Sequence, residues 1–278
     1  MSFKRKIKML IPDPIFLKVK FKIEMQQNLD LKHPTSFNQK LQWLKLNDRN
    51  AEYTKMVDKY EVKLIVKEKI GQEYVVENYG LWDSFDEIDF SHLPNQFVLK
   101  CTHDSGGVVI CSDKSNFNYE KAKIKIENSL NSNFYHVSRE WPYKNVQSRI
   151  IAEKFLDNNP MDYKFFCFNG EPRLVLVCSD RYSSNGLKED FYDTDWNKLT
   201  LARTNHPNSE VILDRPSSLD IMLNLSKVLS DNIPFVRVDF YDIKGKVYFG
   251  ELTLYPASGM EGFIPEYWDQ KLGNWIKI

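Results

Sequence analysis

Residues 235–256 read FVRVDFYDIKGKVYFGELTLYP, and this stretch decides the fold. Apolar residues alternate with polar ones on both sides of a short turn, and successive side chains of a strand point to opposite faces. The pattern predicts two antiparallel strands, residues 235–241 and 246–254. A three-residue loop, 243–245, would join them and place Gly245 where a positive φ is needed.

Charged side chains gather on one face of this predicted hairpin. The register pairs Asp239 with Phe249. It also pairs Arg237 with Glu251, so Asp239 and Glu251 become diagonal neighbours, roughly 7–8 Å apart at the backbone. A divalent cation suits two converging carboxylates, since Mg²⁺ favours a few carboxylates together with phosphate oxygens, and Thr253 could add an oxygen. The alternative is a surface ion pair of Arg237 and Glu251 with Asp239 in water, but the alternating apolar residues indicate partial burial, which makes an unpaired acid costly.

Two other segments carry residues suited to a nucleotide. Lys100 ends an apolar strand, 97–100, and precedes the loop 102–107, whose two glycines let backbone N–H groups approach an anion. Lysine offers phosphate a point charge. Glu153 lies in a second apolar strand, 149–156, that ends in a polar turn and could offer an adenine ring an apolar slot with edge hydrogen bonds. The plainer alternatives are a solvated lysine and an ordinary strand.

The rest of the chain mixes helical and strand patterns. Apolar residues at helical spacing and capping residues predict four helices, and alternating runs predict more strands. The predicted helices are residues 36–47, 54–70, 118–131 and 216–231. The further predicted strands are residues 108–111, 163–168 and 173–178. Because the strands form hairpins without regular βαβ alternation, the pattern indicates an α+β fold.

Composition excludes several classes of protein. The 278 residues allow one large domain or two modest ones, and 42% hydrophobic with 27% charged residues excludes disorder. Basic and acidic residues number 38 each, which argues against broad nucleic-acid binding. The four cysteines form no CxxC pair and are expected to be reduced core thiols of a cytoplasmic protein, and no Cys/His spacing suits zinc. Dinucleotide-binding, P-loop, GxSxG and HExxH motifs are absent.

The first 24 residues, MSFKRKIKMLIPDPIFLKVKFKIE, are basic and apolar. Pro12 and Pro14 interrupt them, and no small-residue cleavage site follows, so they make a poor signal peptide. A solvated, partly ordered terminus is the favoured interpretation. The alternative is a peripheral contact with the anionic inner face of the membrane.

Taken together and in this order, these features resemble the ATP-grasp superfamily. The hairpin resembles the metal-binding end of D-alanine–D-alanine ligases, and the nearer resemblance is to the TupA-like branch, named for teichuronopeptide biosynthesis. The stretches that carry it span about residues 34–273 and are SFNQKLQWLKL, DKYEVKLIV, LPNQFVLKCTHDSGG, EWPYKNVQSRIIAEKFL, DYKFFCFNGEP, DFYDTDW and FVRVDFY. The resemblance implies an α+β ATP-grasp fold, with two α+β lobes that clasp ATP between antiparallel sheets. The implied divisions are a basic segment (1–33), a helical or α+β region (34–92), a small lobe (93–156) and a large lobe with the metal site (157–278).

The resemblance also implies how ATP would be bound. Lys59 and Lys100 would grip the α- and β-phosphates. Glu153 would meet the adenine amine, and Asp162 would take the ribose hydroxyls. The loop residues that would fold over the triphosphate are His103, Ser105, Gly106 and Gly107. The residues that would line the adenine hinge are Lys154, Phe155 and Leu156.

The metal site and the reacting phosphate follow from the same resemblance. Asp239, Glu251 and Thr253 would hold Mg²⁺, and Arg237 would stabilise charge on the transferring phosphate or on a tetrahedral intermediate. The superfamily usually has asparagine where Thr253 stands, which puts a second metal in doubt. Arg181 and Lys198 are further candidate contacts to phosphate or substrate that no motif aligns.

The implied activity is that of an ATP-dependent carboxylate–amine ligase that forms an amide through an acyl phosphate. The substrates would be a uronic acid or other glycan carboxylate and an amino-acid amine, on the precursor of a bacterial cell-surface polysaccharide or polyamino acid. Three alternatives remain: a sugar kinase on the same fold, a glycosyltransferase of polysaccharide biosynthesis, and a non-catalytic binding module.

Overall fold

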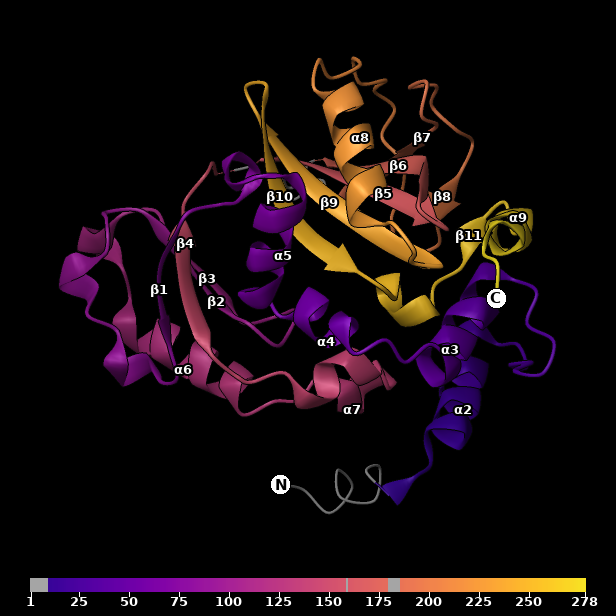
Figure 1. Ribbon diagram of the computed structural model, residues 1–278, viewed down its shortest axis with the longest axis horizontal. Helices are drawn as coiled ribbons and strands as arrows, with labels where there is room; N and C mark the ends of the chain where they lie inside the picture. Colours follow the sequence, from indigo (N-terminus) through magenta and orange to yellow (C-terminus); the bar gives the residue numbers. More distant parts are fainter. Residues whose placement is uncertain (1–9, 159, 180–185) are drawn as a thin grey trace. The chain divides into compact units, whose positions relative to one another are not determined.

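The computed structural model describes residues 10–158, 160–179 and 186–278 (Figure 1). Helices lie against antiparallel sheets, so the predicted α+β class is confirmed. The chain divides into two compact units. Unit 1 comprises Met1–Arg49 and Asn159–Ile278, and unit 2 comprises Asn50–Asn158. The divisions expected after residues 33, 92 and 156 stay predictions.

Unit 1 contains a five-stranded antiparallel sheet in the order β10-β9-β5-β6-β7. Its strands are β5 (Met161–Phe168), β6 (Glu171–Ser179), β7 (Lys188–Tyr192), β9 (Phe235–Ile243) and β10 (Lys246–Thr253). Both predicted hairpins, β5–β6 and β9–β10, are present, and only β7 was not predicted. A second, two-stranded sheet pairs β8 (Ala202–Arg203) with β11 (Phe263–Ile264).

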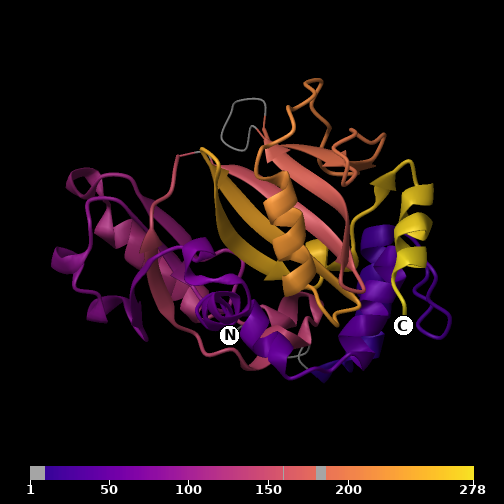
Figure 2. The same ribbon diagram turned by 45° about the horizontal axis from the view of Figure 1, so that its top comes forward.

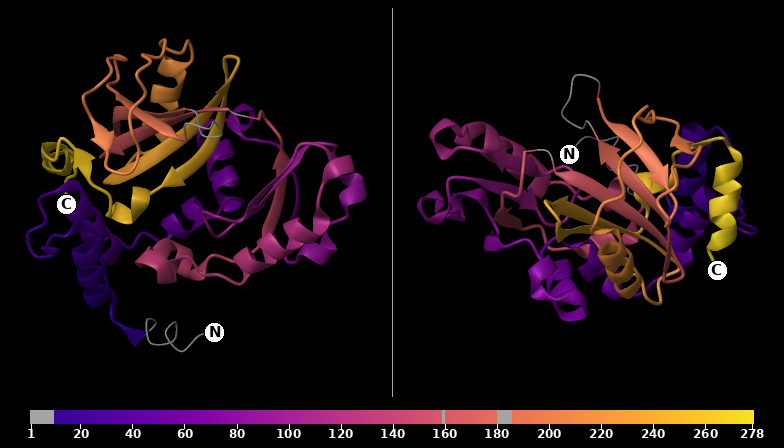
Figure 3. Two further views of the ribbon diagram at one scale, coloured as in Figure 1. Left: turned by 180° about the vertical axis from the view of Figure 1, so that it is seen from behind. Right: turned by 90° about the horizontal axis from the view of Figure 1, so that it is seen from above.

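Helices cover the faces of this sheet unequally. Helix α8 (Leu219–Leu229) lies across one face, where Figure 2 shows it in front of the strands, and buries Met222 and Leu229. On the opposite face, α3 (Phe37–Asn47) places the Phe37 ring 4.9 Å from that of Phe235. Helix α9 (Tyr267–Trp275) packs against α3, and Figure 3 shows the two side by side. Phe37 also lies against Phe166 and Phe168 of β5 on this face. The charged residues Lys164 and Asp239 project from the same face of the sheet.

Residues 13–25 differ from the expected partly ordered terminus. They form helix α2 (Asp13–Met25), whose buried face includes Leu17 and Phe21. Pro12 precedes the helix, and Pro14 lies in its first turn. Backbone N–H groups of a first turn have no hydrogen-bond acceptor within the helix, so a proline there costs no hydrogen bond. The prolines therefore begin this helix and do not interrupt it. The basic residues Lys4, Arg5, Lys6 and Lys8 lie outside the described residues.

Unit 2 contains a four-stranded antiparallel sheet in the order β1-β4-β2-β3. Its strands are β1 (Asn78–Trp82), β2 (Phe97–Cys101), β3 (Val108–Cys111) and β4 (Ile150–Lys154). Helix α6 (Tyr119–Leu130) packs Ala122 and Ile126 against Leu99 and Ala152 on one face. Strands β2, β3 and β4 and this helix were predicted, whereas β1 and the short α7 (Tyr135–Ser138) were not.

The helix predicted over residues 54–70 is wrong, because two helices occupy this region. They are α4 (Glu52–Val57) and α5 (Glu61–Ile70). The Asp58 carboxylate accepts hydrogen bonds from the backbone N–H groups of Tyr60 (2.7 Å) and Glu61 (3.1 Å), so it caps α5 and ends the preceding helix. Gly71 ends α5 with φ 115°, as predicted.

The cysteines are buried and unpaired, which confirms that part of the prediction. Burial raises the pKa of the Cys101 thiol to about 11 and that of Cys167 to about 12. No helix within the described ranges has the length and apolar character needed to cross a membrane.

Candidate functional site

The β9–β10 turn has two residues, not the three predicted. Ile243 pairs directly with Lys246. Lys244 (φ 55°) and Gly245 (φ 84°) both have positive φ, the backbone of a tight turn whose twist matches that of the strands. Gly245 therefore has the predicted conformation, but the three-residue loop was wrong.

A bulge at Gly250 then shifts the register by one residue. Phe249 pairs with Phe240, and Glu251 pairs with Asp239. A Cβ on Gly250 would lie 3.1 Å from the Asp239 carbonyl oxygen, so a side chain would be crowded there. The two carboxylates therefore lie directly opposite one another and are not diagonal neighbours as predicted. The sequence signal was the glycine inside a strand pattern.

Arg237 holds both carboxylates of the hairpin. Its Nε donates to Asp239 Oδ1 and its Nη2 to Asp239 Oδ2, each at 2.7 Å. The same Nη2 lies 2.7 Å from Glu251 Oε1 and 3.1 Å from Thr253 Oγ1. The surface ion pair considered as the alternative is thus present between Arg237 and Glu251. Asp239, however, is only 2% exposed and is not solvated.

Lys164 is a member of this cluster that the sequence analysis did not identify. It pairs across β5 and β9 with Asp239, and its Nζ lies 2.5 Å from Asp239 Oδ2 and 2.7 Å from Asp162 Oδ2. Burial alone would lower the pKa of Lys164, but the charges of Asp239, Asp162 and Glu251 together outweigh burial and raise that pKa, so the ammonium stays charged. The available signal was the D-x-K spacing in the predicted strand, which puts Asp162 and Lys164 on one face.

The possible ligand atoms of this cluster are carboxylate oxygens, the kind that Mg²⁺ prefers. Three carboxylates, from Asp162, Asp239 and Glu251, face the two cations Lys164 and Arg237, which leaves one net negative charge. Mg²⁺ in phosphate sites is commonly held through one or two carboxylates, with the other ligands from water and phosphate. Among the residues that the structure describes, no group of three or more His, Cys, Asp or Glu is arranged to hold a metal. The residues therefore fit an ion shared with a phosphate substrate, and the metal assignment stays a prediction.

In unit 2, Glu153 is the centre of a second charged cluster. Its carboxylate pairs with Lys63 Nζ at 2.6 Å and with Lys100 Nζ. Lys63, on α5, was not identified from the sequence, although it comes four residues after Lys59 in the motif DKYEVK. Both Glu153 and Lys100 extend from the sheet face opposite α6. Glu153 thus bonds two lysines here, and its role at an adenine amine stays a prediction.

Lys59 lies in the break before α5 and contacts the loop 102–107. Its Nζ donates to the Cys101 carbonyl at 3.1 Å and to the Asp104 carbonyl, and lies 3.9 Å from Asp104 Oδ1. The Gly107 N–H donates to Asp104 Oδ1 (3.1 Å) and Oδ2 (3.0 Å). Lys59 and Asp104 therefore give the loop a fixed internal structure.

The predicted triphosphate contacts of this loop are differently exposed. His103 is buried, and its Nε2 lies 3.1 Å from the Ser129 carbonyl oxygen. Gly107 is also buried, whereas Ser105 and Gly106 are exposed. Ser105 and Gly106 are therefore the two of the four whose atoms solvent reaches.

The remaining described candidates have other surroundings. Lys154, whose N–H donates to the Glu77 carbonyl at 2.9 Å, is exposed, and Phe155 and Leu156 are half-buried. Lys198 Nζ pairs with Asp190 Oδ1 at 2.8 Å. Arg181 lies outside the described residues.

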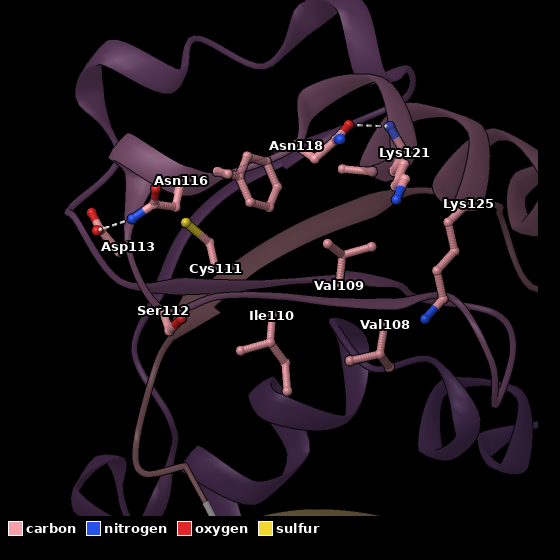
Figure 4. Close-up of a pocket in the computed structure, with 12 residues that line it drawn as sticks. Val108, Val109, Ile110, Cys111, Ser112, Asp113, Asn116, Asn118, Lys121 and Lys125 are labelled. Carbon is pink, nitrogen blue, oxygen red and sulfur yellow. Dashed lines mark hydrogen bonds between the residues drawn. The ribbon is translucent and has the colours of Figure 1, made fainter.

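A hollow in unit 2 contains none of the predicted site residues. It has a volume of about 420 Å³ and lies beside the edge strand β3. Figure 4 shows Lys121 and Lys125 of α6 along it, with Val108 and Val109 below them.

The two larger antiparallel sheets thus each carry a lysine–carboxylate cluster on one face. The chain belongs to the TupA-like ATP-grasp family, since the model of that family, described as TupA-like ATPgrasp, matches residues 39–277. The family and fold implied by the sequence resemblance are therefore confirmed. No curated protein sequence matches the chain.

Solved structures with a similar chain path include three ligases. The D-alanine–D-alanine ligase from Bacillus anthracis complexed with ATP is 15% identical, with 72% of this chain and 53% of that chain covered and a TM-score of 0.42. The D-alanine–D-alanine ligase from Helicobacter pylori is 15% identical, with 87% and 70% covered and a TM-score of 0.44. The ATP-grasp ligase PsnB complexed with minimal precursor, Mg and ADP is 8% identical, with 73% and 52% covered and a TM-score of 0.41. The chain spans about half the length of the first of these.

Proposed function

We propose that this chain is an ATP-dependent carboxylate–amine ligase that forms an amide bond through an acyl phosphate. Membership of the TupA-like ATP-grasp family supports this. The observation that carries the proposal is the buried Arg237, whose guanidinium is fixed by Asp239, Glu251 and Thr253. A cation held in place before the reaction needs no reorganisation when charge develops on a transferring phosphoryl group.

The proposed chemistry has two steps. An oxygen of the substrate carboxylate attacks the γ-phosphorus of ATP, the bond from that phosphorus to the β–γ bridging oxygen breaks, and ADP leaves. The amine nitrogen then attacks the acyl carbon, inorganic phosphate leaves, and the nitrogen loses a proton to solvent. No protein nucleophile is required, so the reaction relies on positioning and charge.

Each charged cluster has groups suited to this chemistry. In unit 1, Arg237 would stabilise negative charge on the transferring group, while Lys164 keeps the buried Asp239 compensated. Asp239, Glu251 and Thr253 would hold Mg²⁺, which when bound neutralises phosphate charge. In unit 2, Lys100 and Lys63 offer ammonium groups suited to phosphate oxygens.

We extend the proposal to the substrates: a uronic acid or other glycan carboxylate from a bacterial cell-surface precursor, and an amino-acid amine. The support for this step is the family alone. The purified chain with Mg²⁺ and ATP should be screened for ADP release with uronic acids and glycan intermediates against amino acids.

Hydroxylamine trapping distinguishes the classes of reaction. A ligase gives a hydroxamate, because hydroxylamine intercepts the acyl phosphate. A sugar kinase gives a stable phosphoester, and a glycosyltransferase turns over a nucleotide sugar without hydrolysing ATP. ADP release without hydroxamate for every carboxylate that stimulates it would overturn the ligase proposal.

A further inference from the structure

Helix α2 has apolar side chains on two faces. Leu17 and Phe21 are fully buried in unit 1, whereas Ile15, Val19 and Ile23 are 56%, 56% and 70% exposed. The three exposed residues follow one another at intervals of four, so they form one strip along the helix. The helix precedes residues 39–277, so the strip lies outside the range that the family model matches.

Such a strip is unusual on a surface helix. A helix packed against a protein core normally presents polar residues to water, and an isolated exposed apolar residue needs no explanation. Here three β-branched residues are exposed in succession, and Leu10, just before the helix, is 83% exposed. A contiguous exposed apolar surface of this kind indicates a binding surface.

The charge beside the strip is positive. Lys18 and Lys22 are exposed on the same side of the helix, at positions adjacent to Ile15 and Val19. Residues 1–23 contain seven of the 38 basic residues and one of the 38 acidic residues. The rest of the chain therefore has 31 basic and 37 acidic residues, a net charge of −6. An anionic surface would attract this segment and repel the remainder, which gives the contact a defined orientation.

We propose that the exposed face of α2 docks on an anionic lipid bilayer. Ile15, Val19 and Ile23 enter the boundary between headgroups and acyl chains, while Lys18 and Lys22 lie at the level of the lipid phosphates. Leu17 and Phe21, on the opposite face of the helix, are buried in a hydrophobic cluster of unit 1, so the helix is already folded when it binds.

A second copy of the chain fits this face less well. A twofold contact sets the same surface against itself, so Lys18 and Lys22 of one copy would approach those of the other. Acidic lipid headgroups instead complement these charges. Exposed apolar and basic side chains on one helix face are the pattern of helices that lie in the membrane interface.

The test is flotation of the full chain with vesicles of phosphatidylcholine, alone or mixed with phosphatidylglycerol, at low and high salt. We expect flotation with the mixed vesicles that weakens as salt rises. The variant Ile15→Gln/Val19→Gln/Ile23→Gln should bind about tenfold more weakly or worse. Glutamine is a good helix former, and circular dichroism verifies that the variant folds.

A matched control is available on other helices. Ile124, Ile221 and Val228, on α6 and α8, are also two isoleucines and one valine, and they are 58%, 44% and 44% exposed. Their triple replacement by glutamine should leave vesicle binding unchanged. The variant Lys18→Gln/Lys22→Gln should bind more weakly and with less dependence on salt, and it keeps the test decisive if the apolar triple variant does not fold.

Three results would overturn the proposal. The first is equal flotation of the wild type and the α2 variants, or equal losses in the α2 and control triple variants. The second is binding that ignores phosphatidylglycerol. The third is self-association in sedimentation velocity, without vesicles, that the α2 triple variant abolishes, because the strip would then be covered by a second copy. None of these readouts involves ATP, so failure here is distinct from failure of the ligase proposal.

Discussion

Glu153→Gln is the substitution whose effect the structure specifies most closely. The Glu153 carboxylate is buried and pairs with Lys63 Nζ at 2.6 Å and with Lys100 Nζ. Burial alone would raise its pKa, but the charges of Lys100 and Lys63 outweigh burial and lower the pKa from 4.5 to about 2. The folded protein therefore holds this carboxyl group ionised far more firmly than the unfolded chain does.

The size and pH dependence of the contribution follow from that difference. Lowering the pKa from 4.5 to about 2 corresponds to roughly 3 kcal/mol of stability at neutral pH. Because the folded pKa is the lower one, the contribution is complete above the unfolded pKa and is lost as the pH falls through the folded pKa. About half of it should remain near pH 3, and almost none below about pH 2.

The measurement is urea unfolding of wild type and Glu153→Gln between about pH 3 and pH 7. We expect the variant to be about 3 kcal/mol less stable at neutral pH, with a gap that narrows as the pH falls below about 4.5. Glu52→Gln is the matched control, since Glu52 also pairs with a lysine (Lys55, 3.0 Å) but at an exposed position, and it should cost less than about 1 kcal/mol. A loss under about 1 kcal/mol in Glu153→Gln, or a gap that does not change with pH, would refute the reasoning.

Three other predictions concern the hairpin, the loop and a helix cap. Glu251→Gln should change stability by less than about 1 kcal/mol, because Glu251 is 48% exposed, and it should lower Mg²⁺-dependent ADP release at least about tenfold. Full activity in this variant would contradict the role of Glu251 in holding Mg²⁺. Asp239→Asn, at the buried end of the cluster, should cost about 3–5 kcal/mol in urea unfolding. Gly107→Ala should lower stability by about 1–3 kcal/mol, since its Cβ would lie 2.2 Å from Ser129 Oγ. Gly106→Ala faces open space, so its stability should differ from that of the wild type by less than about 0.5 kcal/mol. Equal thermal midpoints for the two variants would count against this prediction. Asp58→Ala should cost about 1–2 kcal/mol, because the Tyr60 and Glu61 N–H groups lose their acceptor, and unchanged urea unfolding would show that the cap does not matter.

Local patterns were sufficient for much of the fold. Ser36 caps α3 by accepting from the Gln39 N–H, as its position before an apolar helical repeat indicates. The β5–β6 and β9–β10 hairpins follow from alternating runs around turn residues, because pairing of strands adjacent in sequence needs little more than a turn. The family resemblance, spread over most of the chain, was likewise readable from the sequence.

Local patterns failed where two local solutions compete. Asp58 can sit within a helix or cap the next one, and the second solution prevails with Arg149 Nη2 3.1 Å from its carboxylate. The β9–β10 strands could pair around a three-residue loop, but the two-residue turn with a bulge at Gly250 is what forms. In both cases the decision depends on partners that spacing along the chain does not reveal.

The sequence by itself determined which residues carry charge on each strand and which faces those residues share, because alternation is a property of the strand alone. Only the tertiary structure decided their partners. Lys164 joins Asp239 from a strand 75 residues earlier, and Lys63 reaches Glu153 from a helix in another part of unit 2. Burial raises the energy of an isolated charge, so the partner that removes this cost is selected by distance in the folded chain and not by distance along the sequence.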